Sequence, residues 1–339
     1  MARSEITIDL GALRRNVHTL LRVLDGAELW AVVKANAYGH GAADCAAAAL
    51  EAGASALCLA TVAEALELRP RFPEARLIVL GPTASSELAA VREARLELVV
   101  ATGEIPEGIP VHVKLDTGMG RWGVTELTAP TRDVVGLMTH LATADDDPAF
   151  ARRQIERFRA ATEPFAHLTR HVANSAAALR IPEARFDAAR CGLALNGLSP
   201  FGADPADDGL EPVLRWTSEI ALSKLLHAGE STGYGRRFVA DRDTWIGIVP
   251  VGYGDGFRRD LTGTELLVAG ERRRVVGAVS MDALAVELDR ELLGGTEVTI
   301  VGDGLRLEEH ARVAGTIVWE LACGINSSPA RARRAIMGS

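Results

Sequence analysis

Residues 29–41 read LWAVVKANAYGHG, and this stretch indicates the class of fold to which the chain belongs. Five apolar residues, too few for a helix, end at Lys34, and a turn leads into a helical pattern at 41–51. Lys34 is one of only three lysines beside 34 arginines. An amine, unlike a guanidinium, can lose its proton and attack a carbonyl. Lys34 is therefore a candidate Schiff-base lysine at the end of a buried strand.

The same alternation of short strand and helix continues through the first two-thirds of the chain. Helical patterns such as 61–68 and 150–161 follow most of the apolar runs. The runs lie at 29–34, 57–60, 76–80, 96–100, 111–115, 134–140, 168–173 and 188–195. Eight strands in this order predict an α/β fold with a (β/α)8 TIM-type barrel, at 10–212. The links at 103–110 and 124–133 are too short for full helices, so we expect a trimmed outer ring.

The pattern changes near Pro212, after which short strands alternate with Gly and Asp turns. These runs lie at 220–222, 245–249, 266–268, 274–279, 284–286 and 298–301. Such spacing predicts a C-terminal all-β domain at 213–339. We expect the N-terminal strand, at 1–9, to join it.

Composition excludes several classes of function. A formal net charge of −8 argues against nucleic acid as a partner. The four cysteines are far apart and form no C-x-x-C motif, which predicts a reduced cytoplasmic protein with no zinc or other metal site. No apolar run approaches membrane-spanning length, so we expect no membrane partner.

Candidate functional residues gather where the predicted barrel strands end, which is where barrel enzymes carry their active sites. Lys34, Lys114 and His140 stand at such ends, and Arg190 lies within the last strand, where a buried arginine needs a partner. After strands seven and eight, a phosphate could meet the Ser175 hydroxyl and the backbone N–H groups of two residues. These are Gly192 and Leu193.

Taken together, these residues resemble the alanine racemases, the fold-type III enzymes that use pyridoxal 5'-phosphate (PLP). The resemblance extends from 6–10 to about 323–324. It rests on motifs at 33–41, 114–123, 139–145, 174–177, 190–192, 233–235, 251–256 and 280–282.

The resemblance implies a two-base mechanism. Lys34 would bind PLP covalently and act as the base for the D-enantiomer, while Tyr234 would act on the L-enantiomer. In the family this tyrosine comes from the partner subunit, so a homodimer would share its active sites. His140 would orient Tyr234 and contact Arg190, which would donate to the pyridine nitrogen.

The remaining implied roles concern the substrate and the phosphate. Arg121 would contact the substrate carboxylate and the cofactor phenolate. Lys114 would orient Arg121, either as a carbamate or as a salt-bridge partner of Asp116; both alternatives stay open. The residues expected to hold the phosphate are Tyr38, Ser175, Gly192 and Leu193. Those expected to line the substrate entrance from the second subunit are Tyr253, Met281 and Asp282.

Three positions depart from the family pattern. Asn196 and Trp319 stand where tyrosine is usual, and the segment 325–331 lacks the tyrosine that narrows the substrate channel. The predicted function is a PLP-dependent racemase that interconverts L- and D-alanine. The alternatives are a racemase of another amino acid, such as serine or a biosynthetic non-protein amino acid, a PLP decarboxylase of the same fold type, or a non-catalytic PLP-binding protein.

Overall fold

The computed structural model describes residues 3–338, which divide into two compact units. One unit comprises Ala12–Phe201 and Pro205–Glu211. The other comprises Gly202–Asp204, the described chain from Pro212 on, and the N-terminal segment up to Gly11. Each unit is described separately below.

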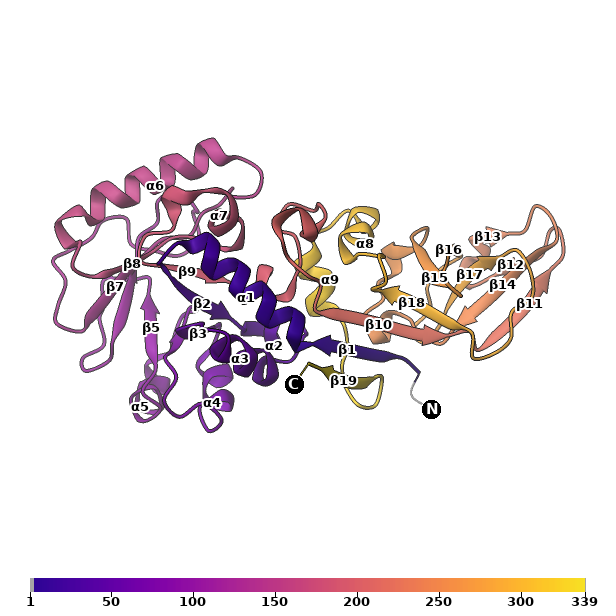
Figure 1. The fold of residues 1–339 in the computed structure, drawn as a ribbon, viewed down its shortest axis with the longest axis horizontal. Coiled ribbons are helices and arrows are strands. Elements are labelled where there is room, and N and C mark those ends of the chain that lie inside the picture. Colours follow the sequence, from indigo (N-terminus) through magenta and orange to yellow (C-terminus); the bar gives the residue numbers. More distant parts are fainter. Residues whose placement is uncertain (1–2, 339) are drawn as a thin grey trace. The chain divides into compact units, whose positions relative to one another are not determined.

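The first unit is a closed barrel of eight parallel strands, so the predicted fold class is confirmed (Figure 1). The strands are β2 (Glu28–Val32), β3 (Ala56–Leu59), β4 (Leu77–Val79), β5 (Glu97–Val100), β6 (Val111–Lys114), β7 (Val134–Met138), β8 (Thr169–His171) and β9 (Ala188–Cys191). Pairing of β9 with β2, with Arg190 opposite Trp30, closes the barrel. All eight carboxyl ends therefore lie at one end of it.

Helices follow most of the barrel strands, but not all of them. They are α2 (Lys34–Tyr38), α3 (Ala42–Glu51), α4 (Val62–Leu68), α5 (Leu88–Glu93), α6 (Pro148–Thr162) and α7 (Ser175–Arg180), and α1 (Leu10–Leu24) precedes the first barrel strand. No helix forms between β5 and β6 or between β6 and β7, both of which lie wholly within the described residues. Two of these helices begin with N-cap residues that the sequence supplies. Thr61 and Glu64 form a capping box at the start of α4, and Asp147 is the N-cap of α6, directly before Pro148.

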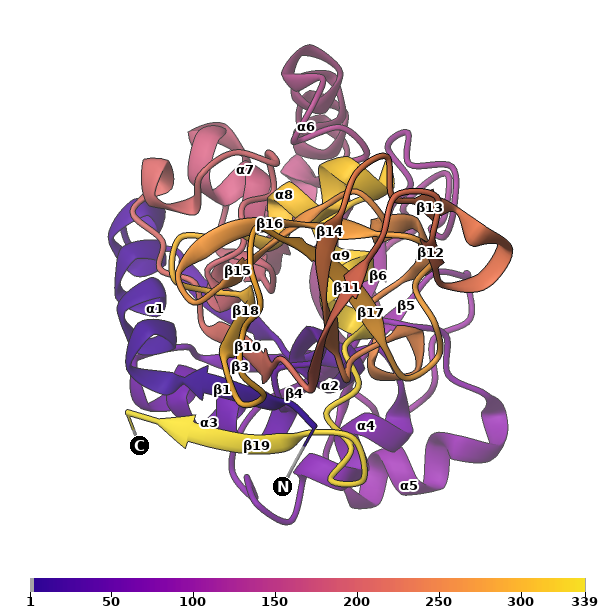
Figure 2. The same ribbon diagram turned by 90° about the vertical axis from the view of Figure 1, so that its right-hand side faces the viewer.

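The second unit is built on a nine-stranded sheet in the order β11-β14-β17-β16-β15-β18-β10-β1-β19. Strand β1 (Glu5–Asp9) pairs antiparallel with β10 and parallel with β19, which Figure 2 shows beside it. The other strands are β10 (Leu214–Glu219), β11 (Leu222–Leu226), β14 (Thr244–Val249), β15 (Glu265–Val268), β16 (Glu271–Val276), β17 (Leu284–Leu288), β18 (Glu297–Val301) and β19 (Arg333–Met337). A two-stranded hairpin, β12 (Ser231–Thr232) with β13 (Phe238–Val239), and two helices, α8 (Leu307–Ala314) and α9 (Val318–Gly324), complete the unit.

Some strand ranges predicted from the sequence are wrong. The eighth barrel strand ends at Cys191 rather than at residue 195, because the chain turns into a 3-10 helix at Ala194–Asn196. In the run at 220–222, the first two residues join β10 to β11 and only Leu222 belongs to a strand, because Ile220 donates its N–H to Thr296 beyond the end of β10. The strand predicted at 274–279 is β16, which begins earlier, with the charged residues from Glu271 on. It ends at Val276, because Gly277 follows with a φ of 69°.

None of the helices within residues 3–338 has both the length and the apolar character needed to cross a membrane.

Candidate functional site

Lys34 begins a left-handed turn at the carboxyl end of β2. The next four residues, Ala35 to Tyr38, all have φ between 51° and 55°. A run of non-glycine residues in this region is strained, and such strain persists only where surrounding contacts hold it. Strained backbone of this kind is concentrated at functional sites.

Side chains from three elements hold the turn in place. Glu64, in the first turn of α4, accepts hydrogen bonds from the N–H groups of Ala35 (2.8 Å) and Ala60 (2.7 Å). The Asn36 side chain accepts from the N–H of Ala42 at 2.8 Å. Asn196, one of the departures from the family pattern, is buried and donates to the carbonyl of Ala37 at 3.1 Å. Asn196 thus supports the turn that presents Lys34.

The surroundings of Lys34 favour the neutral form of its amine. Burial, and next the charge of Arg121, lower the pKa of Lys34 below its usual value of 10.5; Arg190 also lowers it. A neutral amine is both a nucleophile and a base.

Lys114 ends β6 and is only 4% exposed. Burial, followed by Arg121 and Arg190, lowers the pKa of Lys114 to about 8. The alternative in which Lys114 forms a salt bridge with Asp116 is wrong. The Asp116 carboxylate instead accepts the backbone N–H groups of its own loop, at Gly118, Met119 and Gly120. Lys114 is left buried among cations with no carboxylate in ion-pair contact among residues 3–338.

A cavity of about 500 Å³ opens beside this lysine, at the carboxyl ends of β4, β5 and β6. Lys114, Arg121 and Trp122 line one wall, and apolar residues such as Leu98 and Ile105 line others. The Trp122 ring lies 5.7 Å from Lys114 Nζ and 5.4 Å from Arg121 Cζ. This volume and lining suit a small ligand with an anionic group.

Arg190, on β9, is 4% exposed and makes all its hydrogen bonds through its two terminal nitrogens. Nη1 donates to Nδ1 and to the carbonyl of His171, both at 2.8 Å. Nη2 donates to the carbonyls of Thr139 (2.9 Å) and Val172 (3.2 Å). Burial lowers the pKa of Arg190 to about 10, so the guanidinium keeps its charge at neutral pH. Its Nε–H has no partner among residues 3–338.

His140 follows β7 and contacts the same guanidinium. Its Nδ1 lies 3.2 Å from Arg190 Nη2. Because arginine can only donate, His140 Nδ1 accepts, and its proton resides on Nε2. Burial, and next the charge of Arg190, hold the pKa of His140 well below 6.5, so this ring is neutral.

Ser175 and Gly192 form a small polar cradle where α7 begins. The Ser175 hydroxyl accepts the N–H groups of Gly192 (3.2 Å) and Ala194 (3.3 Å). The Tyr38 ring lies against Gly192, where an added Cβ would be 2.5 Å from the tyrosine hydroxyl oxygen. Leu193 is buried directly after Gly192. The four residues predicted to hold a phosphate therefore lie together.

The predicted residues of the second unit lie on two loops and a turn. Backbone hydrogen bonds from Tyr253 to Ser280 (3.0 Å) and from Gly254 to Met281 (2.9 Å) join the loops. Tyr253 and Met281 are exposed, and Tyr234 is 72% exposed. The 3-10 turn at Tyr234–Arg236 starts at Gly233, where an added Cβ would lie 3.3 Å from the backbone nitrogen of Ala278.

Asp282 is held by two arginines rather than left free. Arg331 Nη1 lies 2.9 Å and Arg3 Nη1 3.2 Å from its Oδ1. Hydrogen bonds from Arg331 and Arg3 lower the pKa of Asp282. Arg331 also contacts the buried Asp255 at 3.0 Å, and Asp255 accepts the N–H of Gly252 across the turn that it caps.

The segment that lacks the family tyrosine packs on the same loops. Asn326 donates its side-chain N–H to the carbonyl of Gly254 at 3.1 Å, and its backbone N–H to that of Asp255 at 3.0 Å. Trp319 is half-buried in α9. The segment therefore stabilises the loop that carries Tyr253.

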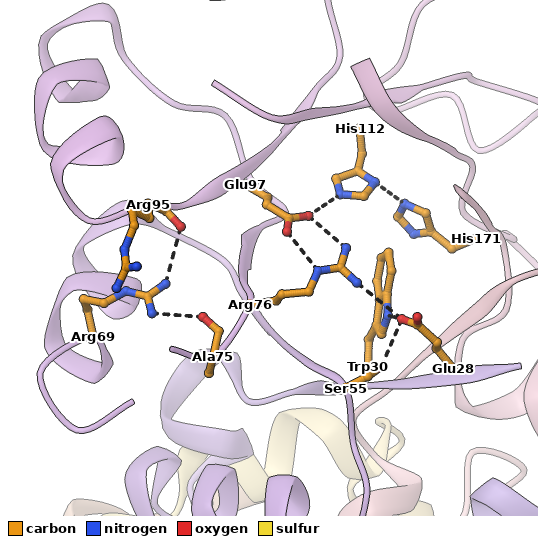
Figure 3. Close-up of polar contacts among 10 residues, drawn as sticks. All are labelled: Glu28, Trp30, Ser55, Arg69, Ala75, Arg76, Arg95, Glu97, His112 and His171. Atoms are coloured by element: carbon orange, nitrogen blue, oxygen red, sulfur yellow. Dashed lines mark hydrogen bonds and ion pairs between the residues drawn. The ribbon is translucent and has the colours of Figure 1, made fainter. Parts of the chain in front are cut away.

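The sequence analysis missed the residues behind Arg190. His171 and His112 are fully buried, and Glu97 lies next to them at the start of β5 (Figure 3). Their signal in the sequence is the presence of ionisable side chains within apolar barrel strands, where such residues are rare unless paired.

A parallel barrel with ionisable residues at the carboxyl ends of its strands has the arrangement of the barrel enzymes. Comparison with known sequences makes this more specific. The family described as "Alanine racemase, N-terminal domain" matches residues 8–200, and "Alanine racemase, C-terminal domain" matches residues 213–333. The chain therefore belongs to the alanine racemase family.

Individual relatives agree with this assignment. Alanine racemase 1 of Bacillus subtilis is 40% identical over 94% of this chain and 90% of its own length. Alanine racemase of Levilactobacillus brevis is 39% identical over 98% of this chain and 98% of its own length. The crystal structure of alanine racemase from the D-cycloserine producer Streptomyces lavendulae superposes with a TM-score of 0.91, at 33% identity, over 100% of this chain and 98% of that one.

Proposed function

We propose that this protein is a PLP-dependent alanine racemase that works as a homodimer in the cytoplasm. The observation that carries the proposal is the set of Lys34, Arg121, Arg190 and His140 at or near the carboxyl ends of the barrel strands, of which Arg190 is buried. These residues supply an amine whose pKa is lowered, two cations and a neutral imidazole. The spacing of the cysteines in the sequence supports the location.

The residues present fit PLP. The Nε–H of Arg190 is free to donate to the pyridine nitrogen, and the Lys34 amine is positioned by its strained turn. Gly192 leaves room beside the Tyr38 hydroxyl that a Cβ would fill, which suits a phosphate held by Tyr38, Ser175 and the backbone at Gly192 and Leu193. When bound, PLP supplies an imine and a ring that delocalise the electrons left at Cα after proton removal.

The chain's own residues then control the proton. We infer that Lys34 Nζ removes or returns it on one face of Cα, and that the Tyr234 hydroxyl does so on the other. Arg190 keeps its proton at neutral pH, so it would donate a hydrogen bond to the ring nitrogen without protonating it. Arg121 would bind the substrate carboxylate.

Residues of a second copy complete the proposed site. Tyr234, Tyr253 and Met281 are large and exposed, which favours a role against another surface. In the proposed homodimer, the Tyr234 of each subunit serves the Lys34 of its partner, and Tyr253, Met281 and Asp282 line the substrate entrance.

Gly192→Ala tests the phosphate cradle. Gly192 does not have a positive φ, so alanine adds no backbone strain, and its whole effect comes from the Cβ that would meet Tyr38. We expect unfolding free energy to fall by about 1–3 kcal/mol from overpacking. We expect PLP affinity to fall at least about tenfold, since one lost hydrogen bond to a charged group is worth about 1.5–3 kcal/mol. Denaturant unfolding and titration with PLP measure these effects.

Gly103→Ala is the matched control, because a Cβ there has nothing within 4 Å. Unchanged PLP affinity in Gly192→Ala would contradict the cradle.

Lys114 is proposed to carry a carbamate. With a pKa of about 8, roughly a tenth of this amine is neutral at pH 7, and a neutral amine adds CO2 to give a carbamate and a proton. The product would place an anion beside Arg121, for which residues 3–338 show no ion pair. Protein equilibrated with ¹³C-bicarbonate should show one carbamate carbon resonance that Lys114→Arg lacks. A spectrum without that resonance in the unmodified protein would refute the carbamate.

The substrate is tested by chiral analysis. Purified protein with PLP should interconvert L- and D-alanine. Because the segment at 325–331 lacks the channel tyrosine, serine and 2-aminobutyrate should also react, with kcat/KM below that for alanine by no more than about 10–200-fold. If the protein converted another amino acid but not alanine, that amino acid would replace alanine as the proposed substrate.

A further inference from the structure

A continuous line of hydrogen bonds runs through the barrel interior to Arg190. Glu97 opens β5, His112 lies in β6, and His171 ends β8. Glu97 Oε2 lies 2.9 Å from His112 Nε2, and His112 Nδ1 lies 3.0 Å from His171 Nε2 (Figure 3). His171 Nδ1 lies 2.8 Å from Arg190 Nη1. We call Glu97, His112 and His171 the barrel relay. It joins the amino-terminal end of the barrel to the proposed pyridine-binding arginine.

The imidazole rings of His112 and His171 are closely packed inside the barrel. Both histidines are fully buried, and the Trp30 ring packs on them with centroid distances of 5.5 Å to His112 and 4.4 Å to His171. Gly136 on β7 leaves them room: a Cβ there would lie 2.1 Å from His112 Nδ1, the atom bonded to His171. Their position is therefore fixed by packing as well as by hydrogen bonds.

Arg76 fixes the outer end of the relay. Its Nε and Nη2 donate to the two carboxylate oxygens of Glu97 at 2.9 and 3.1 Å. Burial alone would raise the pKa of Glu97, but hydrogen bonds from His112 and Arg76 lower it to about 2. Glu97 is thus an anion at neutral pH, and it can only accept.

The two ends of the relay determine where its protons lie. Arginine only donates and a carboxylate only accepts. His171 Nδ1 must therefore accept from Arg190, so its proton is on Nε2 and points at His112. His112 Nδ1 accepts that proton, so its own proton is on Nε2 and points at Glu97. When both rings are neutral and carry their protons on Nε2, every hydrogen bond of the relay has one donor and one acceptor.

No other protonation state does so. A proton on Nδ1 of His112 would force His171 to accept at Nε2 and to carry its own proton on Nδ1. That proton would face the N–H of Arg190, and two donors would meet in a buried site, where an unsatisfied polar group is strongly unfavourable. Burial, and for His171 also the charge of Arg190, lower the pKa of both rings, which agrees with neutral imidazoles.

We propose that Glu97 is a positioning residue for the racemase reaction, acting through the fixed tautomers of His112 and His171 to orient the guanidinium of Arg190 so that its Nε–H faces the pyridine nitrogen. This inference rests on the proposed function, since it assigns a purpose to Arg190 that only PLP gives it.

Glu97→Gln removes the charge at the outer end of the relay with a change of one atom. Arg76 donates to both carboxylate oxygens of Glu97, so the glutamine keeps its oxygen at only one of the two positions. Where its amide takes the Oε2 position, it donates to His112 Nε2, the protons of both rings move to Nδ1, and His171 no longer accepts from Arg190. Glu28→Gln is the matched control, because Glu28 also bonds Arg76, at 3.3 Å, but does not touch the relay.

The first measurement needs neither cofactor nor turnover. Nitrogen-15 NMR of protein labelled in histidine, with His112→Gln and His171→Gln for assignment, separates protonated from unprotonated ring nitrogens. We expect Nε2–H tautomers for both residues in the unmodified protein and in Glu28→Gln. In Glu97→Gln we expect Nδ1–H tautomers to appear beside the Nε2–H tautomers, at unchanged circular dichroism.

The second measurement follows the effect at Arg190. With PLP labelled at its pyridine nitrogen, the resonance of that nitrogen should move in Glu97→Gln and stay in Glu28→Gln. The kcat for alanine should fall about 10–100-fold, the usual range for residues that orient a directly contacting group, with little change in KM. Glu97→Asp, which keeps the carboxylate, should lose less than Glu97→Gln.

The proposal is overturned if either histidine carries its proton on Nδ1 in the unmodified protein. It is also overturned if Glu97→Gln leaves both the tautomers and the pyridine resonance unchanged. The tautomers are measured without cofactor, so this result does not depend on the proposed function. A protein that bound no PLP would refute the proposed function, and the NMR spectra would still show whether the relay has the proposed tautomers.

Discussion

Lys34→Ala should abolish racemisation and leave PLP without a covalent attachment. The expected loss is at least about 10⁴-fold, the upper end of what a positioned base contributes, because this substitution removes both the base for one face and the attachment point. The measurements are the rate of alanine racemisation and the mass of the protein after treatment with PLP and borohydride, which fixes an imine irreversibly.

The structure makes the choice of lysine specific. Lys34 lies in a strained turn with its pKa lowered by burial and Arg121, whereas Lys224 lies in β11 of the other unit, so Lys224→Ala is the control and should match the unmodified protein. Lys114 is the other buried lysine, at the end of β6. If peptide mapping placed the reduced cofactor on Lys114 or Lys224, the assignment of Lys34 would be wrong.

Whether a strand could be predicted from the sequence depends on how far its two faces are buried. The eight barrel strands are short apolar runs because a parallel strand is covered on both faces, so they were predictable with errors of a few residues at their ends. Strands β11 and β16 carry Lys224 and a run of arginines, since parts of them face solvent, and the predicted runs at 220–222 and 274–279 overlap them only in part.

The site shows the same division. Lys34, Arg190 and His140 were identifiable because each stands at or near a strand end in a distinctive motif. The barrel relay was not, because Glu97, His112 and His171 meet across the barrel interior and are separated by 15 and 59 residues along the chain. Nearness in sequence misled at Lys114 and Asp116, where the carboxylate is satisfied by its own loop.

Tyr234→Phe should slow racemisation by about 10²–10⁴-fold while leaving PLP bound. The substitution removes one oxygen from a side chain that is 72% exposed, so neither folding nor the phosphate cradle should change. The exchange of the Cα–H of L-alanine in D2O measures the lost step directly. Exchange from D-alanine is an internal control, because its proposed base, Lys34, is intact. Unchanged exchange from L-alanine would contradict the assignment of two bases.

A mixture of Lys34→Ala and Tyr234→Phe tests which chain supplies the tyrosine. In a mixed homodimer of the proposed kind, one site takes Lys34 from the second variant and Tyr234 from the first, so that site is intact and the other lacks both bases. Random exchange places half of the chains in mixed dimers with one working site in two, so activity should return to about a quarter of the unmodified rate. Each variant alone should stay inactive. If mass spectrometry shows that subunits have exchanged and no activity returns, each site is built from a single chain, and the exposed face that carries Tyr234 requires another explanation.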